Sequence, residues 1–581
     1  MFKNTHAFFH TMTSTSILKL INDQKKLILL IGCGFFAIQA LLFILNFGIN
    51  FIQFGDAWLI PTSSEILIDD YISDTFFNEI DPHLALFPKL LILLSYLFDN
   101  LNFVHLMILG WIFLIICLFF HFKILQNIDE RLTWMIIPIA AFVFSPLQHF
   151  ALVWAFGGLQ WELAVLGIVM STYFLNKKPF KKKFLIFSIF GSLLASYSLI
   201  SGIASWITGL ISFSKKSKII LIWITIGTSV LISYLYTAKS LGSSQNNLDA
   251  LLTTDGLTYV LTYFSIPFRL KIPELNLLAG IVTVVMLVCV IIYFFKKDRT
   301  EFSKITPYVQ FTLITFFIAI MHAIGRLGDT ELKSWLFGHT SYYAMISNLS
   351  QIALMVLLFL LVLKFWQTKR KIAILFLLII VLQLFLLSPG YYLGWQWGDE
   401  YFQKNSEKYS CFSESPKNTP LCNELFNSSP SLIHSANYLL EKKLSIFTNN
   451  EFNQNYIYDL NEMNISWYDN ITKMGVGEID EVNNMSVSDV KFVQISENYV
   501  NVSGTLSQKI DKFEYIILLK DEKPFAKLNV DSNEPVLFWE FTFLSGYIEK
   551  CDEFTINGIS NGNNVTIEEN IIICIHENLP N

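Results

Sequence analysis

The chain has 581 residues, of which 53% are hydrophobic and only 15% are charged, and its mean hydropathy is +0.48. Soluble domains contain about 25% charged residues, so the composition excludes an ordinary soluble protein and indicates a membrane protein. The net charge of −6 comes without a basic stripe, which argues against a nucleic-acid partner.

Eleven apolar stretches are candidates for membrane-spanning helices, because a helix needs about 20 apolar residues to cross a bilayer. They lie at 27–47, 102–122, 133–147, 160–176, 184–199, 200–214, 218–237, 275–295, 306–324, 343–366 and 371–388. The fifth and sixth form one continuous run with lysines at both ends. We therefore expect this run to cross twice and to turn near Ser198.

Basic residues gather in the connections on one side of these spans, and such clusters mark the cytoplasmic side. They lie at 19–26, 123–131, 177–183, 215–218, 296–304 and 369–371. Eleven crossings then predict a cytoplasmic N-terminus and an extracytoplasmic C-terminal region. We expect a transmembrane domain over 1–390, with a first external loop over 48–101.

That first loop is acidic and has no Lys or Arg between residues 51 and 88. Its ionisable residues are Asp56, Glu65, Asp69, Asp70, Asp74, Glu79, Asp81 and His83. Asp56 is the leading candidate for catalysis, because it directly follows the first span, where solvation of a carboxylate is poor. Glu79, Asp81 and His83 are the competing candidates. The loop has enough acids for a divalent cation such as Mg²⁺ or Mn²⁺, but no ligand spacing that requires one.

Other candidate binding residues follow on the same side of the membrane. Aromatic rings can stack on sugars, amide and carboxylate groups can hydrogen-bond them, and arginine can hold a phosphate with paired hydrogen bonds. The candidates of these kinds, with Lys89 ahead of an expected amphipathic helix, are Trp58, Lys89, His149, Trp154, Gln160, Trp161, Glu162, Arg326, Tyr342 and Tyr343.

From residue 391 the apolar spans stop and short β-rich segments alternate with turn residues. This pattern predicts an extracytoplasmic domain over 391–581, with a mixed front part over 391–455 and a β-sandwich-like part over 456–581. Its four cysteines suggest two disulfides in an oxidising compartment. By proximity alone, we expect Cys411 to pair with Cys422 and Cys551 with Cys574.

Several short motifs resemble those of the multi-pass bacterial glycosyltransferases of the GT-C fold. They are G-D-A-W (55–58), H-L-A-L-F-P-K-L (83–90), G-R-L-G (325–328) and S-Y-Y (341–343). The sequence departs from the family pattern at Leu84 and Tyr342, where arginines are expected. The acid expected beside His83 is displaced toward Glu79.

This resemblance implies an inverting transfer of a sugar from a polyprenyl-phosphate donor to a glycan or lipid-linked acceptor. The reaction would take place on the outer face of a bacterial inner membrane, in contact with membrane lipids. Asp56 would act as general base, and Arg326 would hold the phosphate of the leaving lipid. A transporter or flippase and a surface-polysaccharide polymerase or ligase are the alternatives. The former usually shows repeated halves and charges inside its spans.

Overall fold

The computed structural model describes residues 24–50, 84–213, 217–238, 253–270, 272–297, 299–326, 343–413 and 445, together with seven strands between 489 and 574. The chain divides into two compact units. Unit 1 comprises residues 1–410 and 441–449, and unit 2 comprises residues 411–440 and 450–581.

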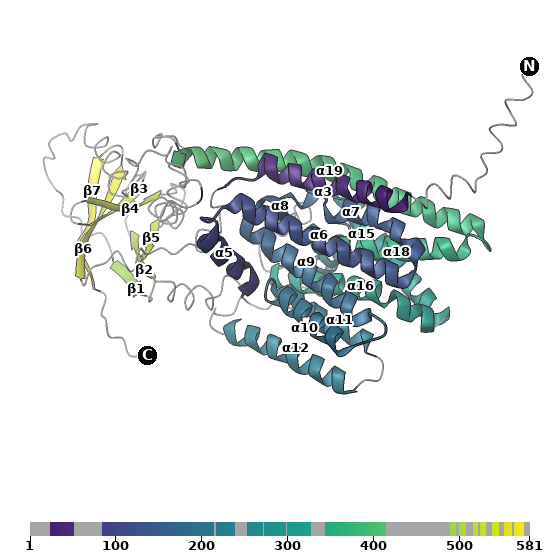
Figure 1. Ribbon diagram of the computed structural model, residues 1–581. Helices are drawn as coiled ribbons and strands as arrows, with labels where there is room; N and C mark the ends of the chain where they lie inside the picture. The colour runs from purple at the N-terminus through teal and green to yellow at the C-terminus, as the bar shows by residue number, and fades with distance from the viewer. Residues whose placement is uncertain are drawn as a thin grey trace, which may run out of the picture. The chain divides into compact units, whose positions relative to one another are not determined.

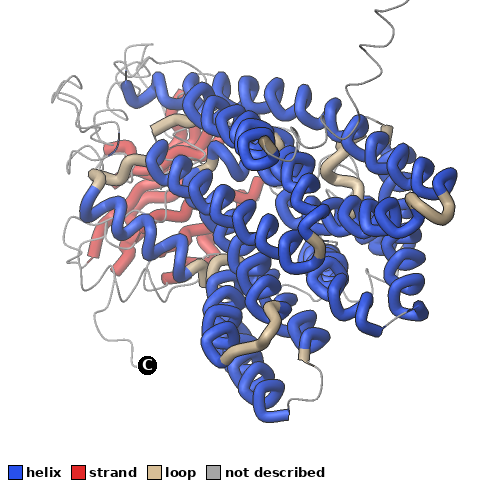
Figure 2. The backbone as a smooth tube through the Cα atoms, turned by 45° about the vertical axis from the view of Figure 1, so that its right-hand side comes forward, coloured by secondary structure: helices blue, strands red, loops and turns tan. Residues whose placement is uncertain are grey.

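The described part of unit 1 is a bundle of helices (Figures 1 and 2). Its helices are α3 (Lys25–Phe47), α5 (Leu86–Phe98), α6 (Phe103–Ile128), η3 (Glu130–Met135), α7 (Ile136–Val143), η4 (Pro146–Gln148), α8 (His149–Val153), α9 (Ala155–Asn176), α10 (Lys182–Ser196), η5 (Ile200–Ile203), α11 (Ala204–Gly209), η6 (Leu210–Ser212), α12 (Ser217–Ala238), α14 (Thr254–Tyr263), α15 (Pro273–Lys297), α16 (Arg299–Arg326), α18 (Ala344–Phe365) and α19 (Arg370–Ser413).

Within the described residues, nine helical stretches are long and apolar enough to cross a membrane. They match nine of the eleven predicted spans, as expected of a multi-pass membrane protein. Helices α9 and α18 are almost entirely buried, whereas α3, α12, α15 and α19 expose large apolar side chains such as Leu30, Leu221 and Phe385. The exposed apolar side chains lie on helices that would face lipid.

The two predicted spans at 184–199 and 200–214 are the exceptions. Helix α10 has 15 residues, which is about 22 Å at 1.5 Å per residue, and a hydrocarbon core is about 30 Å thick. The return arm, Ile200–Ser212, is shorter still. The turn falls at 197–199, so the prediction of a turn near Ser198 is confirmed. The prediction of two full crossings is wrong, because the segment is a hairpin of two short arms.

Polar side chains inside the bundle fix this hairpin. Gln310 on α16 donates to the carbonyl oxygen of Thr208 (3.2 Å) and to Ser212 Oγ (3.0 Å) on the return arm. Asn176, at the end of α9, donates to Gln310 Oε1 (2.6 Å). In a membrane interior each backbone carbonyl needs a partner within the protein. These amides provide partners where the hairpin's short helices end.

Polar side chains of α18 provide hydrogen-bond partners for the last carbonyl groups of two other helices that end inside the bundle. Asn348 donates to the carbonyl oxygen of Phe142, near the end of α7 (2.8 Å). Ser347 donates to that of Tyr263 (2.6 Å), and Gln351 donates to that of Phe264 (2.5 Å), both at the end of α14. The last carbonyls of a helix lack partners within the helix. The polar stripe of α18 therefore caps α7 and α14.

Helix α19 is continuous across the predicted domain boundary at 390. It runs for 44 residues and contains Pro389. Its second half lies beside α3 (Figure 1), where the Trp395 ring packs 5.1 Å from the ring of Phe43. The predicted boundary therefore falls within a helix, and unit 1 extends to residue 410.

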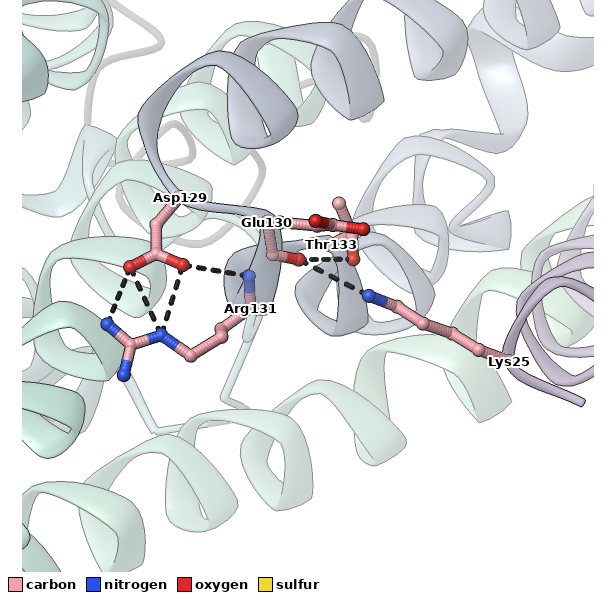
Figure 3. A network of polar contacts seen from close by, with 5 residues as sticks. All are labelled: Lys25, Asp129, Glu130, Arg131 and Thr133. Atoms are coloured by element: carbon pink, nitrogen blue, oxygen red, sulfur yellow. Dashed lines mark hydrogen bonds and ion pairs between the residues drawn. The ribbon is translucent and has the colours of Figure 1, made fainter. Parts of the chain in front are cut away.

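The two ends of the bundle differ in charge. At one end Lys25 donates to the carbonyl oxygen of Glu130 (3.4 Å), Arg131 pairs with Asp129 (2.7 Å), and Thr133 donates to the Glu130 carbonyl oxygen (2.6 Å) (Figure 3). We call this the basic end, because the lysines that flank α3, α6, α9, α15 and α18 lie there. We call the opposite end, where α3 ends and α6 and α9 begin, the loop end.

A short tie closes the loop end around the start of α6. Asn50 Oδ1 accepts a hydrogen bond from the backbone N–H of Phe103 (2.8 Å). Ser445 donates its backbone N–H to the carbonyl oxygen of Asn100 (2.7 Å) and its hydroxyl to that of Asn50 (2.7 Å). Residue 445 therefore holds together the end of α3 and the turn between α5 and α6.

The described strands of unit 2 are β1 (Asp489–Ile495), β2 (Tyr499–Leu506), β3 (Tyr515–Lys520), β4 (Lys523–Asn529), β5 (Leu537–Leu544), β6 (Cys551–Ser560) and β7 (Asn563–Cys574). They form a three-stranded sheet in the order β1-β2-β5 and a four-stranded sheet in the order β4-β3-β6-β7. All neighbouring strands are antiparallel. The sandwich, which requires one sheet to pack on the other, stays a prediction.

Candidate functional site

Several of the residues proposed from the sequence lie outside the described part of the chain. These are Asp56, Trp58, Glu79, Asp81, His83, Tyr342 and Cys422. Arg326 is the last residue of α16, and Cys411 lies in α19. For these two only the backbone is described, so their roles stay predictions.

Four aromatic side chains from four elements meet toward the loop end, and we call them the aromatic cluster. Trp161 of α9 lies 5.4 Å from Tyr343, which precedes α18, and 5.8 Å from His322 of α16. His322 lies 4.6 Å from Tyr343 and 5.7 Å from Tyr263 of α14. All four distances are between ring centroids. The structure therefore brings together Trp161 and Tyr343, which the sequence proposed separately, and adds His322 and Tyr263.

A second group, which we call the Arg269 cluster, contains a residue that the sequence analysis missed. The guanidinium carbon of Arg269, which follows α14, lies 3.9 Å from the centroid of the Trp397 ring on α19. The His149 ring of α8 lies 5.6 Å from the same Trp397 ring, and the charge of Arg269 acts on His149. Three segments far apart in the sequence thus place an arginine, a histidine and an indole side by side.

The Arg269 side chain keeps its charge in this place. Burial lowers the pKa of Arg269 to about 10, so the guanidinium remains protonated at neutral pH. A guanidinium on an aromatic face is stabilised by the ring's quadrupole and presents its N–H groups at the edge. The sequence analysis proposed Arg326 because it is an arginine in a predicted external connection. The same signal could have identified Arg269.

The Phe150 ring connects Trp154 to the Arg269 cluster. Phe150 packs 5.3 Å from Trp154 and 6.1 Å from His149, again between centroids. Gly157, one turn into α9, leaves room for the Trp154 ring, because a Cβ there would lie 2.1 Å from the indole. His149 and Trp154, which the sequence proposed together, therefore lie in one aromatic region.

Lys89 is the most deeply buried basic side chain among those proposed. It lies on α5, the predicted amphipathic helix, and only 1% of its surface is exposed. The backbone N–H of Phe87 donates to the carbonyl oxygen of Tyr197 (3.4 Å), which connects α5 to the turn of the hairpin. Lysine is rarely buried to this extent, so this position keeps Lys89 among the functional candidates.

Glu162 is also buried, but it points into the bundle. It is 2% exposed, and a Cβ on Gly110 of α6 would lie 1.7 Å from its Oε2 atom. Its Oε1 atom has no hydrogen-bond partner among the described residues. Glu162 is seven positions after Ala155, the first residue of α9, so it lies roughly 10 Å below that end at 1.5 Å per residue. An ionisable side chain at such depth is a functional candidate by default.

The sequence segment that contains residues 149–162 does not form one sugar-binding surface. Successive residues of a helix point about 100° apart, so Trp161 faces α16 and α18, whereas Glu162 faces α6. Gln160, between two buried neighbours, is itself buried. The proposed residues are thus divided between the aromatic cluster, the Arg269 cluster and the interior of the bundle.

The sequence leaves a divalent cation in the acidic loop as a possibility. Among the described residues, no group of three His, Cys, Asp or Glu side chains could hold a metal ion, and the acidic loop lies outside that part.

Cys33, Cys117 and Cys289 of the bundle are free thiols. In the four-stranded sheet, Cys551 and Cys574 are register partners on β6 and β7.

Comparison with known proteins finds no matching protein family and no matching curated protein.

Proposed function

We propose that the protein is a membrane glycosyltransferase that moves a sugar from a polyprenyl-phosphate donor to a glycan or lipid-linked acceptor. Transfer would invert the anomeric centre and take place at the loop end of the bundle. The proposal draws on the short motifs of the GT-C glycosyltransferases and on the charged side chains buried at this end.

The observation that carries the proposal is the Arg269 cluster. A phosphate linked to a lipid needs a cation that is held at the membrane boundary and shielded from competing water. Arg269 is charged, largely buried and stacked on Trp397, and a guanidinium forms paired hydrogen bonds with phosphate oxygens. It would hold the donor phosphate and stabilise the negative charge that develops as the sugar leaves, with Arg326, proposed for this role from the sequence, as the competing cation.

The other residues take roles by their positions. Asp56 would remove the proton from the acceptor hydroxyl, with Glu79 or Asp81 as the competing base and His83 assisting. Lys89 would add a second positive charge near the donor. The aromatic cluster around Trp161 and Tyr343 would support the sugar-binding side of the site.

Unit 2 would be an extracytoplasmic, sandwich-like domain that binds the acceptor glycan. This location requires the basic end of unit 1 to face the cytoplasm, in keeping with the rule that basic connections stay inside.

The experiment measures sugar transfer in membranes that contain the full-length protein. Membranes are incubated with a panel of radiolabelled polyprenyl-phosphate sugars, and wild type is compared with Arg269→Gln and Asp56→Asn. We expect loss of transfer by at least a hundredfold in both, while Lys181→Gln at the basic end serves as the charge-matched control. Transfer that survives Arg269→Gln removes Arg269 from the phosphate role, and transfer that survives Asp56→Asn removes Asp56 from the base role.

A second candidate, a transporter or flippase for a lipid-linked saccharide or another solute, is favoured by Glu162. A carboxyl group inside a membrane bundle without a hydrogen-bond partner for one oxygen is typical of proton or substrate pathways. Solute flux in vesicles that depends on Glu162, in the absence of transfer from every donor, would establish this function instead.

A further inference from the structure

The ends of α15, α16, α18 and α19 meet at one place of the basic end, which we call the basic corner. It comprises residues 296–304 and 364–371, which contain eight basic and two acidic residues. Lys364 forms an ion pair with Glu301, and this pair joins the two stretches. The corner therefore keeps an excess of positive charge after its ion pair is formed.

Tyr293, near the end of α15, lies under two of these cations. The Lys297 ammonium lies 5.7 Å from the centroid of its ring, and the Lys364 ammonium lies 5.6 Å from it. The same ring packs 5.9 Å from that of Phe365. Two like charges that share one ring repel each other, and an anion near both would offset this repulsion. Glu301 supplies one carboxylate, which forms an ion pair with Lys364.

The hydroxyl group of Tyr293 is an independent sign of a missing acceptor. Its oxygen is buried and has no hydrogen-bond partner among the described residues. Leaving a buried hydroxyl unpaired is unfavourable. A phosphate that enters between the Lys297 and Lys364 side chains would offer this hydroxyl an acceptor and screen the two ammonium groups.

The rim of the corner has the character of a lipid headgroup region. Trp366 is 44% exposed and Phe295 is 63% exposed, and the guanidinium carbon of Arg370 lies 5.5 Å from the Trp366 ring centroid. Exposed aliphatic side chains, including Val288 and Ile292, continue from the rim along α15. Aromatic rings of this kind sit at headgroup depth. Such a surface fits an anion that carries acyl chains better than a soluble anion.

We propose that the basic corner binds the phosphate headgroup of an anionic phospholipid. Lys297, Arg370 and the Tyr293 hydroxyl would contact the phosphate, and the acyl chains would lie along α15. Clusters of four to eight basic residues beside membrane helices have this recognition chemistry. The site lies at the end opposite the Arg269 cluster and is independent of the proposed transfer reaction.

The test counts lipids bound to the purified full-length protein by native mass spectrometry during titration with phosphatidylglycerol. Phosphatidylcholine is the reference lipid. The variant Lys297→Gln/Arg370→Gln is compared with Lys181→Gln/Lys182→Gln, which removes the same charge from the exposed start of α10. One surface cation near an anionic membrane contributes about fivefold in binding. We therefore expect at least tenfold weaker phosphatidylglycerol binding in the first variant and less than twofold weaker binding in the second.

Three outcomes would overturn the proposal. Equal losses in the two variants would mean general attraction by the whole basic end. Equal binding of both lipids by wild type would remove the headgroup charge from recognition. Displacement of phosphatidylglycerol by millimolar inorganic phosphate would identify a soluble anion as the ligand. If the double variant fails to fold, Tyr293→Phe replaces it, and unchanged phosphatidylglycerol binding in that variant would equally contradict the proposal.

Discussion

Asn348 of α18 donates its side-chain amide to the carbonyl oxygen of Phe142 across 2.8 Å, and this bond caps α7 where that helix ends inside the bundle. Removal of the amide leaves a backbone carbonyl without this partner in an apolar interior. We therefore expect Asn348→Leu to destabilise the detergent-solubilised protein by about 1–2 kcal/mol. The measurement is the denaturant midpoint of unfolding, with Gln367→Leu at an exposed position as control. Equal midpoints for the two variants would show that the cap contributes nothing.

The sequence predicts where the spans lie, but not side-chain caps such as this one. The positions of nine spans follow from apolar length alone, and the structure has helices at each of them. Apolar length does not distinguish a crossing from a hairpin of short arms, so the run at 184–214 was misjudged. Gln310 of α16 binds the return arm through the carbonyl oxygen of Thr208, and such tertiary partners cannot be read from one segment.

The candidate site also contains residues that the sequence predicts and residues that only the structure reveals. Sequence chemistry proposed Trp161 and Tyr343, and the structure places them in contact. The sequence analysis did not propose Arg269, although it is an arginine in a predicted external connection; its stacking on Trp397, 128 positions later, is visible only in the structure. Glu162 was grouped with its neighbour Trp161 by sequence, although consecutive helical residues face different helices.

Gly110 and Glu162 form a tight pair between α6 and α9, which gives a second prediction. A Cβ at position 110 would overlap Glu162 Oε2 at 1.7 Å, so Gly110→Ala forces the helices or the carboxyl group to move. We expect a loss of about 1–3 kcal/mol in unfolding free energy, and we expect Glu162→Ala to restore most of it in the double variant. Denaturant unfolding of the single and double variants measures this coupling.

Gly34 supplies the matched control for that experiment. It lies in α3, and a Cβ there would meet nothing within 4 Å. Gly34→Ala is expected to stabilise the protein by up to about 1 kcal/mol, because alanine favours a helix over glycine. A double variant no more stable than Gly110→Ala would contradict a direct contact between Gly110 and Glu162.

The ion pair between Asp129 and Arg131 predicts a dependence of stability on pH. The Arg131 hydrogen bond lowers the pKa of Asp129 below its ordinary 3.8, so the pair stabilises the folded state above that pH. The contribution disappears as the pH falls through the lowered pKa, where the folded carboxylate takes up a proton. Because the Arg131 side chain is 68% exposed, solvent screens the pair, and we expect Asp129→Asn to cost about 0.5 kcal/mol at pH 7 and less at pH 2.

Glu130 is the control for this pH dependence, because it takes part in the network through its backbone carbonyl oxygen (Figure 3). Glu130→Gln should therefore leave unfolding unchanged at both pH values. Thermal unfolding of wild type and both variants across this range makes the comparison. A deficit in Asp129→Asn that is as large at pH 2 as at pH 7 would rule out an electrostatic origin.

The register of β6 and β7 makes the last prediction. Cys551 and Cys574 are partners at the end of the strand pair, where backbone positions of opposed residues lie within the span of a disulfide. If unit 2 faces an oxidising compartment, we expect both thiols to be blocked in protein isolated without reductant. Gel-shift labelling with a large maleimide should then be absent at these positions in wild type and should appear at Cys574 in Cys551→Ser. The reverse variant, Cys574→Ser, should expose Cys551 equally. Labelling of both cysteines in wild type without reductant would contradict the disulfide and, with it, the assignment of unit 2 to the outer side.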